Sequence, residues 1–260
     1  MTLPVEKPRS RLRIVALADS LALPRREGTD ILLWEETWPS VLGRLLRDEG
    51  ISAEVINCGA RARTIDSVNA DFVEHVVFKA PDVILLQVGV VDCAPRVFTR
   101  RVQKLLRHRL MPASLRTATI EWAHHRRREI VSRNPLARVY TRPHAFMRHL
   151  WLLAGKLAEV GDVRLGVLPI IGDIERMEEK SPGFANNVSL YNSFLEEFAR
   201  RSGRPLISLS TSAEWFGSDG YHLTASGSRA VAEAALAWLL SISHRGQEPV
   251  RARGEEARWA

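Results

Sequence analysis

The chain has 260 residues, of which 45% are hydrophobic, and a formal net charge of +7 at pH 7. This length and composition predict one large globular domain, and the presence of only two cysteines, Cys58 and Cys93, excludes a disulfide-rich scaffold. The first residues lack the apolar core of a signal peptide, and no apolar window is long enough to span a bilayer. We therefore expect a soluble, cytoplasmic protein.

Apolar segments alternate with amphipathic ones along most of the chain. The hydrophobic periodicity predicts strands at 13–18, 52–57, 82–89, 164–170 and 205–210, and helices at 37–50, 64–80, 144–161, 188–203 and 224–243. Thr37 and Gly50 are typical residues for the two ends of the first helix. The strand over 82–89 is apolar on both faces, as parallel strands are. This alternation predicts a three-layer α/β/α sandwich with a five-stranded parallel sheet.

One segment breaks the alternation. Residues 96–155 form a long basic stretch of predicted helix, and its part over 96–150 holds fourteen Lys or Arg but only two acidic residues. We interpret it as an insertion in a domain of residues 1–245, which a polar tail follows at 246–260. Such a block attracts anions. It could be a lid that clamps an anionic substrate, a solvated or oligomer-forming face, or a surface for nucleic acid or an anionic membrane. Nucleic acid is the least favoured partner because no binding module is recognisable.

Polar motifs follow four of the predicted strands, at the sheet edge where such folds bind their ligands. The loops after Ala18, Asn57 and Gly89 read "ADSL", "NCGARART" and "GVVDCAPR", and "SDGYHLTASG" comes before the last helix. A serine needs a base to become a nucleophile, and a histidine needs a carboxylate to orient it. Ser20, His222 and Asp219 are therefore the candidate nucleophile, base and orienting acid.

These motifs resemble the blocks of the SGNH, or GDSL-type, serine hydrolases. The first block, Gly-Asp-Ser-Leu in that family, reads Ala18-Asp19-Ser20-Leu21 here, and the last, Asp-x-x-His, reads Asp219-Gly220-Tyr221-His222. The resemblance implies a flavodoxin-like fold, a Ser20–His222–Asp219 triad, and an oxyanion hole that uses the backbone N–H groups of Ser20 and Ala62. Ala62 can donate its N–H as the family's glycine does, provided that its φ is negative. The third block departs from the family, because Val91 replaces the asparagine that supplies a third donor.

The same loops contain further candidates for contact with a substrate. We expect this role, provisionally, for five residues: Asp19, Asn57, Arg63, Asp92 and Arg96. Arg61, Arg63, Arg96 or Asn57 could replace the missing donor, although an arginine could equally bind an anionic substrate. Cys93 is interpreted as a small buried thiol rather than a nucleophile. The cysteine and histidine spacings do not predict a metal site.

The resemblance implies a serine esterase or deacylase that acts on an O-acylated carbohydrate or small metabolite and needs no cofactor. Two alternatives stay open. The same triad could transfer the acyl group to an acceptor other than water. Because Val91 stands where the family has asparagine, the chain could instead be a binding or scaffold protein without activity.

Overall fold

The computed structural model describes residues 11–27, 30–99, 102, 105–106 and 112–244. Its main sheet has four parallel strands in the order β4-β1-β5-β6. The strands are β1 (Leu12–Ala18), β4 (Ala53–Asn57), β5 (Val83–Gln87) and β6 (Arg164–Val167). The tail predicted at 246–260 lies outside the described residues.

The register of the strands brings their carboxyl ends to one edge of the sheet. Ala16 of β1 pairs with Asn57, the last residue of β4, and Ala18 pairs with Gln87, the last residue of β5. The loops after these three strands therefore begin next to one another.

The fifth strand that we expected in the sheet does not form within the described residues. Residues 205–210 form only one parallel bridge, between Leu206 and Val167. Val167 N–H donates to the carbonyl of Pro205 at 3.2 Å, and Ile207 N–H donates to the carbonyl of Val167 at 2.7 Å. Pro205 has no N–H, so it cannot contribute a donor to the ladder.

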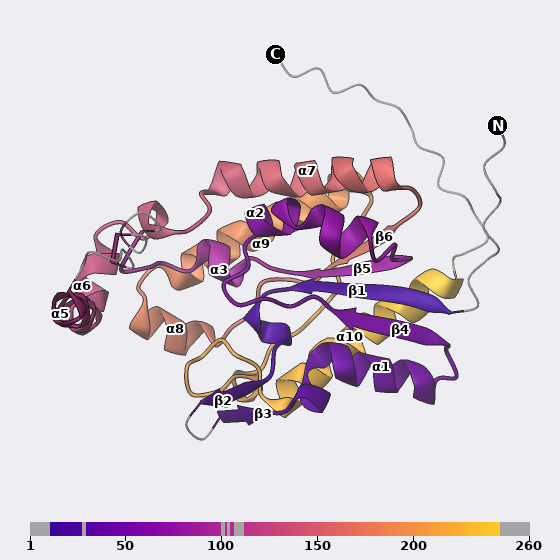
Figure 1. The fold of residues 1–260 in the computed structure, drawn as a ribbon, viewed down its shortest axis with the longest axis horizontal. Helices are drawn as coiled ribbons and strands as arrows, with labels where there is room; N and C mark the ends of the chain where they lie inside the picture. The colour runs from indigo at the N-terminus through magenta and orange to yellow at the C-terminus, as the bar shows by residue number, and fades with distance from the viewer. Residues whose placement is uncertain (1–10, 28–29, 100–101, 103–104, 107–111, 245–260) are drawn as a thin grey trace, which may run out of the picture.

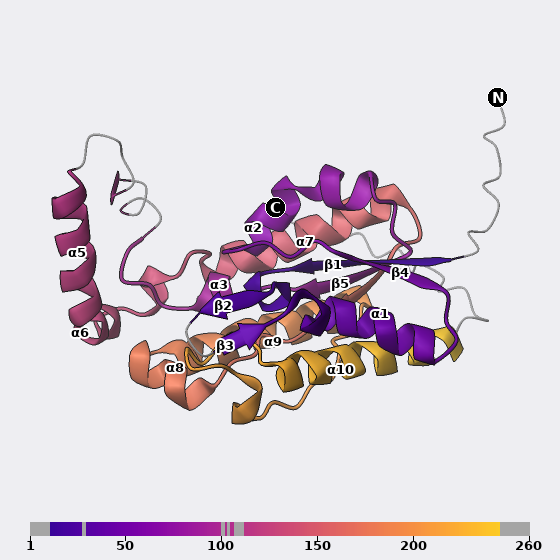
Figure 2. The ribbon, with the colours of Figure 1, turned by 60° about the horizontal axis from the view of Figure 1, so that its bottom comes forward.

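Helices cover both faces of the sheet, which confirms the predicted sandwich. On one face α1 (Trp38–Asp48) packs against α10 (Ala225–His244), and on the other α2 (Ile65–Ala70) packs against α7 (Pro143–Val160). Figures 1 and 2 show α1 and α7 on opposite sides of the strands. A further helix, α9 (Phe184–Ser202), packs against α7.

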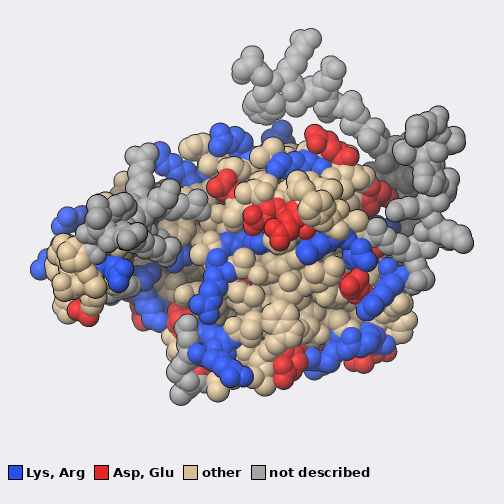
Figure 3. Space-filling view, in the orientation of Figure 1, with Lys and Arg blue, Asp and Glu red and all other residues tan. Residues whose placement is uncertain are grey.

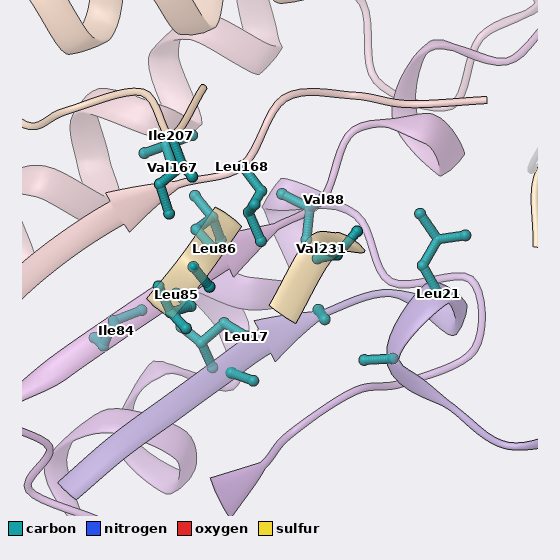
Figure 4. Close-up of a cluster of buried hydrophobic side chains, with 14 of the residues drawn as sticks. Leu17, Leu21, Ile84, Leu85, Leu86, Val88, Val167, Leu168, Ile207 and Val231 are labelled. Atoms are coloured by element: carbon teal, nitrogen blue, oxygen red, sulfur yellow. The ribbon is translucent and has the colours of Figure 1, made fainter. Parts of the chain in front are cut away.

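The core lies between the sheet and these helices. All five residues of β5 are buried, which fits a central parallel strand. Figure 4 shows Leu17 of β1, Leu85 of β5 and Val167 of β6 together in this core. The indole N–H of the fully buried Trp38 donates to Gln87 Oε1 at 2.6 Å, which pairs the indole donor away from water.

Several elements differ from the sequence prediction. The helix expected over 64–80 ends at Ala70 and is followed by a π-helical turn, η3 (Val73–Val77). The antiparallel hairpin of β2 (Arg25–Glu27) and β3 (Asp30–Leu32) and the helix α8 (Ile174–Lys180) were not expected. The remaining short turns are 3₁₀: η1 (Ser20–Ala22), η2 (Trp34–Glu36), η4 (Leu136–Arg138) and η5 (Ala213–Trp215).

The basic stretch is not one long helix. Its described part contains α5 (Ala113–His125) and α6 (Arg127–Ser132), which follow the short helix α3 (Val90–Cys93), and α7 begins separately at Pro143. Figures 1 and 2 show α5 and α6 projecting beyond the end of the sheet where the strands finish. Arg127 of α6 donates to Ser181 Oγ at 2.6 and 2.9 Å, so the projecting part is tied to the end of α8. No helix in the described ranges is both long and apolar enough to cross a membrane.

Candidate active site

The three residues expected to form a triad lie in hydrogen-bonding contact. Ser20 Oγ is 3.0 Å from His222 Nε2, although the two residues are 202 positions apart in the chain, and His222 Nδ1 is 2.6 Å from Asp219 Oδ2. Ser20 begins the turn η1 directly after β1, and His222 lies in the loop before α10. Because a carboxylate can only accept, the Nδ1–H donates to Asp219, which leaves the Nε2 lone pair facing the hydroxyl.

The carboxylate of Asp219 accepts hydrogen bonds from its own turn and is also paired with an arginine of β2. Its Oδ1 accepts the backbone N–H groups of Tyr221 at 3.1 Å and His222 at 3.0 Å, and its Oδ2 also forms an ion pair with Arg25 Nη1. Burial alone would raise the pKa of Asp219, but the hydrogen bonds from His222 and Tyr221 outweigh it and hold this pKa well below its ordinary value. Asp219 is therefore a fixed negative charge behind the imidazole.

The turn that carries Asp219 is held from two sides. Asp30 of β3 accepts from Ser218 N at 2.8 Å and Ser218 Oγ at 2.6 Å, and these bonds lower the pKa of Asp30. From α8, Arg176 donates to the carbonyl of Gly217 at 2.8 Å, and Lys180 donates to that of Ser218 at 3.0 Å. Neither the hairpin nor α8 carries a sequence motif, so these supporting residues could not be found from the sequence.

A pocket of about 190 Å³ opens beside Ser20 and His222. Its other lining residues are Leu23, Pro24, Arg25, Arg61 and Ala62. Within the described part of the chain, the backbone N–H groups of Ser20 and Ala62 donate to no other group. Two residues with unused N–H donors thus line the same pocket, which is the kind of donor an oxyanion hole requires.

The backbone conformation of Ala62 differs from the expectation. Its φ is +55°, in the left-handed region, whereas donation in place of the glycine was expected to require a negative value. A glycine adopts this conformation readily, but a Cβ makes it less favourable by about 1 kcal/mol. The loop therefore keeps the conformation that suits the family's glycine even though alanine occupies the position.

Val91, which replaces the family's asparagine, supplies no donor. It lies in α3, its side chain is 5% exposed, and it belongs to the hydrophobic core. Gly89, before α3, has a φ of +125°, and a Cβ there would come within 2.4 Å of Ile170. The β5–α3 turn is thus built on an obligatory glycine, as in the motif, without the motif's amide.

The five residues expected to contact a substrate do not line the pocket. Asp19 is fully buried: its Oδ1 accepts from Leu21 N at 3.0 Å, while its Oδ2 has no hydrogen-bond partner in the described structure. Burial, with a smaller effect of the nearby Asp92, raises the pKa of Asp19 to about 7. Asn57 joins two loops, because its amide donates to the carbonyl of Ala22 at 2.6 Å and accepts from Gly59 N at 2.8 Å.

The other three residues also bind neighbouring loops. The buried Arg63 donates to the carbonyl of Cys58 at 2.5 Å and to Asp71 at 3.2 Å. Asp92, also fully buried, accepts from Thr141 Oγ1 at 2.5 Å. Arg96 lies over the ring of Tyr140, 5.0 Å from its centroid. The burial of Asp19 and Asp92 leaves them no access to a substrate. The expected direct contact is therefore wrong for these two residues.

Both cysteines are free and buried, and burial raises the pKa of each thiol. A raised pKa disfavours the thiolate that a nucleophile would need. The described residues contain no group of three or more His, Cys, Asp or Glu side chains arranged to hold a metal ion.

Comparison with known proteins gives matches in structure but not in sequence. Neither a protein-family model nor a curated protein matches the chain. A lipase/acylhydrolase from Enterococcus faecalis matches over 93% of this chain and 100% of its own, with 15% identity and a TM-score of 0.60. An acetyl xylan esterase, AlAXEase, matches over 88% and 100%, with 17% identity and a TM-score of 0.60. A lipolytic protein of the G-D-S-L family from Desulfitobacterium hafniense DCB-2 matches over 86% and 98%, with 14% identity and a TM-score of 0.54.

The chain therefore has the fold of the SGNH, or GDSL-type, hydrolases, as the sequence motifs predicted. At these identities the likeness concerns the fold. The chemistry has to be argued from the residues of this chain.

The left-handed conformation of Ala62 leads to a stability prediction. Ala62→Gly should raise the free energy of unfolding by about 1 kcal/mol, because glycine relieves the backbone strain at φ +55°. Urea denaturation measures this change. Ala60→Gly is the matched control: φ is not positive at that position, so the substitution should destabilise. Equal effects of the two variants would contradict the assigned conformation.

The buried carboxyl of Asp19 leads to a pH prediction. The folded protein keeps this proton up to about pH 7, whereas the unfolded chain releases it near 3.8. Unfolding therefore releases a proton between these values, and this residue's contribution to stability falls as the pH rises from about 4 to about 7. Asp19→Asn removes that loss, so its stability relative to the wild type should rise across this range by on the order of 2–4 kcal/mol.

Urea denaturation at pH 4.5 and pH 8 provides the measurement for both proteins. Asp162→Asn, at an exposed aspartate, is the control for loss of one carboxyl group. A stability difference between Asp19→Asn and wild type that does not change with pH would rule out a carboxyl that titrates near neutrality.

Proposed function

We propose that this protein is a serine esterase or deacylase that removes a short acyl group from a carbohydrate or a similar small metabolite. The observation that carries the proposal is the 3.0 Å contact between Ser20 Oγ and His222 Nε2, with Asp219 behind the imidazole and an open pocket in front of the hydroxyl. These contacts support a Ser-His-Asp triad with Ser20 as nucleophile, His222 as base and Asp219 as the orienting acid.

In this mechanism His222 Nε2 takes the proton of Ser20 as Oγ attacks the acyl carbonyl carbon. The carbonyl π electrons move to oxygen, and the N–H groups of Ser20 and Ala62 stabilise the resulting oxyanion. When the intermediate collapses, His222 returns the proton to the departing alcohol, and Ser20 keeps the acyl group. Water, deprotonated by His222, then releases the acid and restores Ser20. Asp219 stays ionised and stabilises the imidazolium in both steps.

The dimensions of the pocket support a short acyl group. About 190 Å³ is below the usual range of roughly 300–1,000 Å³ for pockets that enclose drug-sized ligands. Two of the structures with this fold are an acetyl xylan esterase and an acetyl-xylooligosaccharide esterase from Geobacillus, and both names specify an acetyl ester. An acetyl ester of a sugar or small metabolite is the substrate class that best fits both observations.

The buried Val91 supports a second candidate function, ligand binding without turnover. Two N–H donors remain where the family has three groups, and loss of one oxyanion donor commonly lowers kcat by about 10²–10³. A site weakened in this way could persist in a protein that binds an acylated ligand and releases it unchanged.

Ser20→Ala tests the esterase proposal. The variant should lose at least about 10³ of the kcat for p-nitrophenyl acetate, since it lacks the attacking oxygen. It should also lose covalent labelling by a fluorophosphonate, which wild type acquires and mass spectrometry locates on Ser20. Ser212→Ala, at a serine outside the pocket, is the control. Labelling or turnover that survives in Ser20→Ala at the wild-type level would refute the nucleophile.

Val91→Asn distinguishes a weakened esterase from the second candidate. An amide at this position should supply the missing donor and raise kcat for p-nitrophenyl acetate by about tenfold or more. Val90→Asn places the same amide one residue earlier in α3, also at a buried position, and should give no gain. Thermal melting is the control that checks whether both variants fold. If neither the wild type nor a folded Val91→Asn variant hydrolyses the ester, the result favours binding without catalysis.

A further inference from the structure

We propose that the substrate carries a negative charge close to its ester group and that Arg61 binds this charge. The inference rests on the proposed esterase function and narrows its substrate to acyl esters that bear a carboxylate or a phosphate. Arg61 lies in the loop between β4 and α2, lines the pocket with Ser20 and His222, and is exposed to solvent.

Arg61 differs from the other arginines around the site in its interactions. The guanidinium of Arg25 is paired with Asp219, and that of Arg63 donates to the carbonyl of Cys58 and to Asp71. Arg96 lies over the ring of Tyr140. Among the described residues, Arg61 has neither a hydrogen bond nor an ion pair, so its donors are available to a ligand.

The charge of the pocket favours an anion. Its lining residues include two arginines and no acidic side chain, and the Asp219 carboxylate behind it already interacts with both His222 and Arg25. Figure 3 shows a band of basic side chains over β2, at the end of the sheet where the strands finish. A positive field at this edge would attract an anionic substrate and leave a neutral one unaffected.

The place of Arg61 in the chain decides which part of the substrate it meets. It immediately precedes Ala62, whose N–H is a donor of the proposed oxyanion hole. A guanidinium at this point reaches a group a few bonds from the reacting carbonyl, and its planar set of donors matches a carboxylate or phosphate. Arg61 is thus a specificity residue: it holds the charged group while the acyl carbon faces Ser20.

A pair of aryl acetates that differ in charge tests this inference. 3-Acetoxybenzoate is anionic, and its methyl ester is neutral, while both present the same acetyl group. The measured quantity is the ratio of kcat/KM for the anionic ester to kcat/KM for the neutral ester, compared between variants so that intrinsic reactivity cancels. Arg61→Gln should lower this ratio about tenfold, the size expected for loss of a charge-assisted contact.

Arg164→Gln is the matched control, because Arg164 is an exposed arginine at the first residue of β6, at the opposite end of the strands from the pocket. It should leave the ratio at the wild-type value. An unchanged ratio in Arg61→Gln would overturn the proposal. So would an equal loss for both esters, which would indicate that Arg61 acts on the reacting carbonyl instead.

Calorimetric titration with benzoate measures the same contact without turnover. Benzoate should bind wild type and Ser20→Ala alike and bind Arg61→Gln about tenfold more weakly. Equal affinity for wild type and Arg61→Gln would overturn the anion site even if the protein hydrolyses esters. Absence of Ser20-dependent hydrolysis together with Arg61-dependent benzoate binding would instead refute the proposed function and leave the anion site standing.

Discussion

The carboxylate of Asp219 is the interaction on which the arrangement of the site depends. It accepts hydrogen bonds from the imidazole and from two backbone N–H groups of its own turn, and it pairs with Arg25 from the β2–β3 hairpin. One ionised group thus fixes the tautomer of His222, the shape of the turn and the position of the hairpin. A neutral side chain could not satisfy so many donors at once, since only a carboxylate offers two oxygens and a full charge.

The candidate nucleophile, Ser20, is held by a different part of the structure. The register of β1 with β4 and β5 aligns the strand ends, and buried polar groups join the loops that leave them. Asp19 caps the turn that begins at Ser20, and Asn57 connects this turn to the loop after β4. Residues that the motif suggested as substrate contacts therefore shape the loops around the pocket. Such internal support is what keeps a reactive side chain in position before substrate arrives.

Positive charge has two separate uses at this edge of the sheet. Arg25, Arg176 and Lys180 neutralise or hold the turn that carries Asp219, so their charge is already satisfied within the protein. Arg61 lies at the pocket with its donors unused, where its charge acts on whatever enters. The high net charge of the chain is consistent with both uses, which only the contacts of each side chain can separate.

The sequence by itself determined the alternating α/β order, the parallel sheet and the three candidate residues that the structure brings into contact, Ser20, His222 and Asp219. These follow from hydrophobic periodicity and from motifs of a few adjacent residues, which are local properties of the chain. Tertiary structure alone decided that residues 205–210 form one bridge, that Ala62 is left-handed and that Asp19 is buried away from the pocket. It also placed Arg25 on Asp219, which lies 194 positions away. Each of these outcomes depends on which distant side chains share a small volume, and no local pattern records that.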